Sequence, residues 1–145
     1  MIKFYSIIIL LTGIIILQSC SGSHTISRKI RTGDYTFYMT DSIGNQLADG
    51  TMTLDTTSGN VLSGVYQITN KYLENFPGLR TMKGNYAGNY DRTIHSFYIN
   101  MNPKLADANV MIKGKYTSTY LAGEWVYSTN TGIMSRGNFR AEPNE

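Results

Sequence analysis

The feature that most constrains the fold of this chain is a tripeptide, glycine followed two positions later by an aromatic residue, which occurs seven times. Random placement of 14 glycines among 11 tyrosines, five phenylalanines and one tryptophan in 145 residues would give only about two such pairs. A spacing of two places both residues on the same face of a β-strand. Barrels use such glycines to bend their strands, and a neighbouring ring covers the bare backbone. The tripeptides begin at Gly33, Gly64, Gly84, Gly88, Gly114, Gly123 and Gly137.

Apolar and polar residues alternate through much of the remaining sequence, for example over residues 108–116 and 119–128. This is the pattern of an antiparallel sheet with one buried face. We therefore expect an all-β domain over residues 33–141, an eight-stranded antiparallel up-and-down barrel, with a β-sandwich as the alternative. Residues 142–145 are left as a tail. The predicted strands are 33–40, 51–57, 61–69, 81–90, 94–101, 108–116, 119–128 and 132–141.

The first twenty residues carry a separate signal. Lys3 precedes an apolar run over residues 7–17, which is too short to span a bilayer because a spanning helix needs about 20 residues. A basic start and a short apolar run are typical of a secretion signal helix. The run ends in Leu-Gln-Ser-Cys at Cys20, and this motif resembles the lipobox of bacterial lipoproteins.

The lipobox resemblance implies a lipoprotein signal peptide over residues 1–19 and a lipidated tether over residues 20–32. Cys20 then carries diacylglycerol on its sulfur and an acyl chain such as palmitate on its new amine. In that family, the residue after the lipidated cysteine directs sorting, and Ser21 favours the outer membrane. The implied location is the cell envelope, attached to the membrane through lipid.

Composition excludes several classes of function. Lysine and arginine number 13 against 10 acidic residues, and the scattered excess predicts no nucleic-acid partner. One cysteine excludes a cysteine-rich zinc site, and two histidines leave little for a histidine-built centre. No zinc-ligand spacing, phosphate loop or calcium loop occurs. We expect no metal and no cofactor. We expect no enzyme either, because His95 and Ser96 point to opposite faces of a strand and form no nucleophile–base pair.

Loop lengths give the predicted barrel a polarity. In a meander, alternate connections meet at the same end, and here the long connections 41–50, 70–80 and 102–107 share one end with the short connection 129–131. Long loops in a compact domain are usually functional or mobile. We expect an open mouth at this end, pointing away from the membrane, and its apolar residues are Leu47, Tyr72, Phe76 and Leu105.

The predicted inner face is apolar, includes Met82 and Ile133, and carries several phenol hydroxyls. Such walls suit a hydrophobic or amphipathic guest, and they equally suit a filled core. The aromatic residues that we expect to line a ligand site are Tyr35, Phe37, Tyr66, Tyr86, Phe97, Tyr116, Trp125 and Tyr127.

The glycine–ring strands, with Gly123-Glu124-Trp125 and then Gly137-Asn138-Phe139 near the end, resemble the calycin group of lipocalins, avidins and small bacterial lipoproteins. Those families place glycine and tryptophan on the first strand, whereas the tryptophan here lies on the seventh. The resemblance implies a barrel whose mouth holds a small hydrophobic or amphipathic ligand. The alternative is a protein-binding envelope lipoprotein, an inhibitor or assembly accessory, that uses loops 41–50 and 70–80 on a filled barrel.

Overall fold

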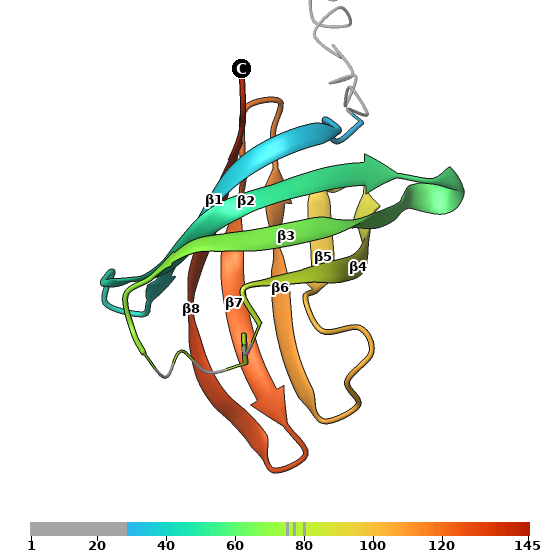
Figure 1. Cartoon of the computed structure of the whole chain (residues 1–145). Helices are drawn as coiled ribbons and strands as arrows, with labels where there is room; N and C mark the ends of the chain where they lie inside the picture. Colours follow the sequence, from blue (N-terminus) through green and yellow to red (C-terminus); the bar gives the residue numbers. More distant parts are fainter. Residues whose placement is uncertain (1–28, 75, 77, 80) are drawn as a thin grey trace, which may run out of the picture.

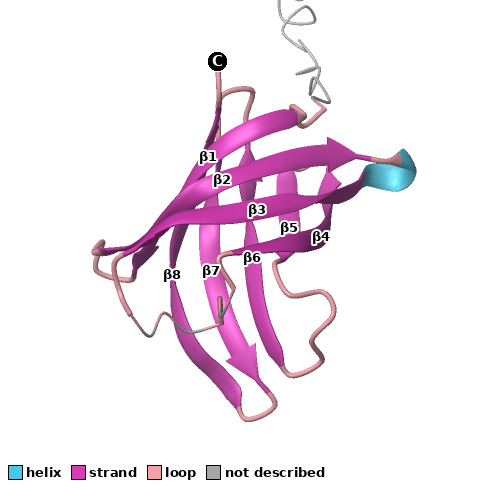
Figure 2. Cartoon of the chain, in the orientation of Figure 1, coloured by secondary structure: helices cyan, strands magenta, loops and turns pink. Residues whose placement is uncertain are grey.

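The computed structural model describes residues 29–145 except 75, 77 and 80. Its eight antiparallel strands follow one another around a closed barrel (Figures 1 and 2), which confirms the predicted up-and-down barrel over the sandwich. A 3-10 turn, η1 (Ser58–Asn60), joins the second and third strands. The strands are β1 (Gly33–Asp41), β2 (Gln46–Thr56), β3 (Val61–Lys71), β4 (Lys83–Asp91), β5 (Ser96–Asn100), β6 (Ala108–Tyr116), β7 (Leu121–Thr129) and β8 (Gly132–Pro143).

The barrel closes by pairing its first strand with its last. Tyr35 stands opposite Pro143 and Asp41 opposite Gly137, so nearly all of β1 pairs with the second half of β8. Closure of this kind gives both strands a neighbour on each side and leaves neither as a free edge.

Glycine–ring tripeptides on paired strands cover one another. Gly64 stands opposite Tyr86 and Tyr66 opposite Gly84, so each of β3 and β4 supplies a ring that covers a glycine of the other strand. A related contact joins β7 and β8, where Trp125 stands opposite Gly137. A Cβ added to Gly137 would lie 2.8 Å from Trp125 Nε1. These contacts confirm the predicted use of a ring to cover bare backbone.

The predicted strands differ from the structure mainly at their ends. The predicted loop 41–50 is wrong, because residues 46–50 belong to β2 and only 42–45 form the connection. Register shifts at Met39/Thr40 and Asp49/Gly50 interrupt the ladders on both sides of this segment. Pairing with both neighbouring strands thus extends β2, and β8 likewise continues to Pro143, two residues beyond the predicted end.

Two residues predicted to face inward are exposed. Ile133 is 59% exposed because β8 has a bulge, where successive pairs are Tyr127 with Ser135 and Ser128 with Ile133. The extra residue reverses the alternation of side chains, since the period of a strand is two. Met82 is 46% exposed and lies at the open end of the barrel wall, one residue before β4 begins.

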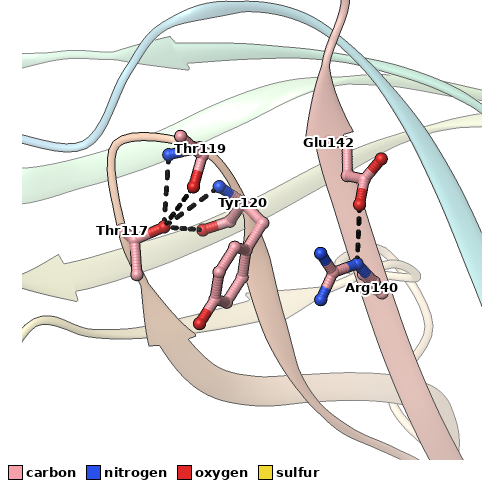
Figure 3. A network of polar contacts seen from close by, with 5 residues as sticks. All are labelled: Thr117, Thr119, Tyr120, Arg140 and Glu142. Carbon is pink, nitrogen blue, oxygen red and sulfur yellow. Dashed lines mark hydrogen bonds and ion pairs between the residues drawn. The ribbon is translucent and has the colours of Figure 1, made fainter.

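The end of the barrel with the short turns is held by local polar contacts (Figure 3). The Thr117 hydroxyl accepts hydrogen bonds from the backbone N–H groups of Thr119 and Tyr120, at 3.2 and 3.1 Å. Arg140 packs its guanidinium over the Tyr120 ring, 4.6 Å from the centroid, and pairs with Glu142. This ion pair is about half exposed, so it contributes at most about 1 kcal/mol to stability.

Candidate functional site

The eight aromatic residues predicted to line a ligand site belong to the packed interior of the barrel. Phe139 lies 6.1 Å from Phe37 and 6.4 Å from Phe97 between ring centroids. Seven of the eight are buried, and only Tyr127 is partly exposed. At the short-turn end Ile30, just before β1, is also buried. The predicted inner face is therefore the hydrophobic core of the barrel.

The segment between β3 and β4 covers the predicted mouth. The Phe76 ring meets the Trp125 ring edge-on at 5.3 Å, and Leu79 is fully buried. Asn102 holds the same segment from the other side, because its side-chain Nδ2 donates to the Gly78 carbonyl at 2.8 Å. Phe76, which was predicted as an apolar residue of the mouth loops, does lie in this loop, and its buried side chain plugs the barrel.

The loop-rich end nevertheless displays apolar side chains to solvent. Of the eleven large hydrophobic side chains that are exposed in the described part of the chain, seven lie at this end. Tyr72 and Leu105 are among them, as predicted, whereas Leu47 is partly buried against the core. Exposed large apolar side chains are therefore more frequent at this end, and apolar surface of this kind can serve for interaction with a partner. The seven are Ile43, Tyr72, Leu73, Met82, Leu105, Ile133 and Met134.

Beside this end, the barrel wall has a gap between β4 and β5. Residues 83–89 of β4 pair with β3, whereas β5 pairs only with residues 87–91. Residues 83–86 therefore have β3 on one side and no paired strand on the other. The connection from β5 to β6 faces this gap, because residues 101–105 line a pocket together with Gly84 and Asn85.

The Tyr66 side chain lines the pocket at this gap. The Tyr66 ring lies over Gly84, and a Cβ on Gly84 would be 2.7 Å from the Tyr66 oxygen. No hydrogen bond of this hydroxyl is found among the described residues. Every fully buried side-chain N or O atom in those residues has a hydrogen-bond partner, so the Tyr66 oxygen is not fully buried. The Tyr66 oxygen is therefore accessible from the gap, although the side chain as a whole is buried.

Other core tyrosines have acceptors for their hydroxyls. Tyr86 donates to the Thr53 carbonyl at 2.9 Å, and Tyr35 donates to the Arg31 carbonyl at 2.8 Å. Burial raises the pKa of both phenols above the ordinary value of 10.0, and the Arg31 charge partly offsets this at Tyr35. Both groups are thus neutral donors at physiological pH.

Two pockets meet at the gap and share Tyr66, Gly84 and Asn85. One, of about 550 Å³, lies along β2, β3 and the start of β4; the other, of about 300 Å³, lies between β4 and residues 101–105. We call the two together the side groove. Among the described residues its lining includes Lys83 and Lys104 and no carboxylate, so the side groove is positively charged.

The described residues contain no cluster of potential metal ligands. No group of three or more histidine, cysteine, aspartate or glutamate side chains lies together in residues 29–145 as described. His95 does not lie on a strand as predicted; it precedes β5 with φ of +50°, and its ring meets Tyr116 edge-on at 5.6 Å. Within the same residues, no helix is long and apolar enough to cross a membrane.

The sequence predicts Tyr66 on the inner face of the barrel, and it predicts neither the side groove nor the other residues that line it. Lys83, Asn85 and Lys104 are ordinary surface residues by type, and nothing in the sequence brings them together. Pro103 gave one usable signal, since proline cannot continue a strand ladder and marks a point before which β5 must end. The predicted anchor at Cys20 lies outside the described residues.

Comparisons with known protein families, with curated proteins and with solved structures found no significant match.

Proposed function

We propose that this chain is a lipid-anchored envelope protein that binds another protein through the loop-rich end of a filled barrel. The proposal is supported by the contrast between the tightly packed interior of the barrel and the exposed apolar side chains at its loop-rich end. The aromatic rings inside the barrel pack against one another in the core, whereas seven large apolar side chains at the loop-rich end face solvent.

The proposed anchor orients this end. β1 begins at the short-turn end, and the tether precedes it. Ten positions separate Cys20 from the buried Ile30, and an extended chain of that length reaches about 35 Å. Lipid on Cys20 therefore keeps the barrel near the membrane, with its loop-rich end directed away from the bilayer and toward partners in the envelope.

A small amphipathic ligand is the second candidate. The side groove favours it, because pockets of about 300 and 550 Å³ lie within the usual range for small-molecule sites. In this version the ligand lies beside Tyr66, outside the packed core.

Site-specific photo-crosslinking in living cells tests the leading proposal. The crosslinking amino acid replaces Ile43 at the loop-rich end and, as the matched control, Ile94 at the short-turn end. Both isoleucines are well exposed, at 84% and 57%. We expect a discrete protein adduct from position 43 and none from position 94. Equal adducts at both positions, or none at position 43, would contradict the proposal.

A further inference from the structure

Two ring-covered glycines in this barrel, Gly64 and Gly137, share a contact that involves three neighbouring strands. Tyr86 of β4 crosses Gly64 of β3 and donates to the Thr53 carbonyl of β2 at 2.9 Å. Trp125 of β7 crosses Gly137 of β8 and donates to the Thr40 carbonyl of β1 at 2.7 Å. In both cases the ring's polar atom ends on a backbone carbonyl of the next strand.

Tyr66 repeats this geometry without the third strand. Its ring crosses Gly84 as the Tyr86 ring crosses Gly64, and each hydroxyl would lie 2.7 Å from a Cβ on its glycine. A Cβ on Gly64 would also overlap the Thr53 carbonyl, whereas the three nearest atoms at Gly84 all belong to Tyr66. The acceptor is missing because β5 ends at Asn100, whose partner is Ala87.

The backbone of β4 is also open toward the gap. Ile68 N–H donates to the Met82 carbonyl at 2.6 Å, so residues 82, 84 and 86 direct their backbone groups toward β3. By the same alternation, the N–H and C=O groups of Lys83 and Asn85 point toward the gap. No hydrogen bond of these groups is found among the described residues.

From these observations we propose that the β4 edge, residues 83–86, binds an extended acidic segment of a partner protein as an added strand. Strand addition to an open edge supplies main-chain hydrogen bonds, and one carbonyl of the added strand would accept from the Tyr66 hydroxyl. The acidic character follows from Lys83 and Lys104, since no carboxylate of the described chain lines the side groove. This inference rests on the proposed function and names how the partner is held.

A second copy of the chain is a poor occupant. Pairing two β4 edges would bring two edges of the same positive charge together, and lysine on an edge strand opposes such self-association. An acidic strand has the opposite charge and is attracted to the same edge.

Binding of a synthetic peptide tests the inference. The probe is a fluorescent octapeptide of alternating valine and glutamate, titrated against the full lipidated chain in non-ionic detergent at low salt. Asn85→Pro removes an N–H that faces the gap, and Asn85→Ala keeps it. We expect Asn85→Pro to weaken binding at least tenfold, Asn85→Ala to leave it within about twofold, and Tyr66→Phe to weaken it about two- to tenfold.

A charge-reversed pair of variants covers the case in which Asn85→Pro disturbs folding. Lys83→Glu with Lys104→Glu leaves the backbone intact, and we expect it to lose the acidic peptide and to bind the peptide in which lysine replaces glutamate. Absence of binding by the acidic peptide, or equal binding by a version with N-methylated backbone amides, would overturn the inference. If the crosslink at position 43 persists in Asn85→Pro, strand addition is wrong while the proposed function stands.

Discussion

Trp125 and Gly137 stand opposite each other on β7 and β8, and the indole lies directly on the glycine backbone. A methyl group at position 137 would lie 2.8 Å from Trp125 Nε1 and would overlap the Thr40 carbonyl that accepts its hydrogen bond. One side-chain atom would therefore disturb the pairing that closes the barrel between β8 and β1.

We expect Gly137→Ala to lower the free energy of unfolding by about 2–4 kcal/mol, the range of severe overpacking. The measurement is chemical denaturation followed by Trp125 fluorescence. Gly59→Ala is the control, because its Cβ meets nothing within 4 Å and its φ of +76° costs only about 1–2 kcal/mol. A smaller loss for Gly137→Ala than for Gly59→Ala would show that the ring does not need a bare glycine.

The Phe76 side chain that plugs the barrel should contribute strongly to stability. Phe76→Ala removes a buried ring from its contact with Trp125, and we expect a loss of about 3–5 kcal/mol together with a shift in tryptophan emission. Leu73→Ala in the same segment removes a side chain that is 45% exposed. It should change stability by less than about 1 kcal/mol. Equal effects of the two variants would argue against a plug.

Buried tyrosines predict instability at high pH. Burial raises the pKa of Tyr86 well above 10.0, and burial also raises the pKa of Tyr35 and Tyr116. The unfolded chain then loses these protons first, so their contribution to stability is complete below about pH 10 and falls as pH rises above it. We expect tyrosinate absorbance to appear together with loss of circular dichroism; ordinary titration of these three residues in the folded protein would contradict this.

The anchor is tested by Cys20→Ala. Thioether attachment needs the sulfur, so we expect the variant to incorporate no labelled palmitate and to leave the membrane fraction. The wild-type chain should incorporate the label and stay with the membrane, and its processing should be sensitive to globomycin. Membrane retention of an unlabelled variant would show that another feature holds the protein there.

The sequence predicted the barrel because its main signal is local. Glycine and ring at a spacing of two define the strand face, whereas the ring that covers Gly64 is Tyr86 of the neighbouring strand. The side groove was not predictable in the same way. Gly64 and Gly84 each begin a Gly-x-Tyr tripeptide, so their sequences look alike. They differ because β5 pairs with β4 only from Ala87 onward, which leaves Gly84 without a strand beyond it.

Errors in side-chain direction have a similar origin. A count of alternate residues placed Ile133 inside, but the bulge near Ser135 changes the count by one. Phe76 lies in a segment without strand periodicity, so its burial depends on Trp125, which is far away in the sequence. Such contacts are set by tertiary packing, which local propensity does not determine.

The most direct test of the account compares two matched variants, Tyr66→Phe and Tyr86→Phe, by chemical denaturation. Tyr86→Phe loses its hydrogen bond to Thr53 and should lower the free energy of unfolding by about 1–2 kcal/mol. Tyr66→Phe should change the free energy of unfolding by less than about 0.5 kcal/mol, because the Tyr66 hydroxyl makes no hydrogen bond among the described residues. Equal losses for the two variants would contradict the account, since Tyr66 would then already have its partner within the barrel.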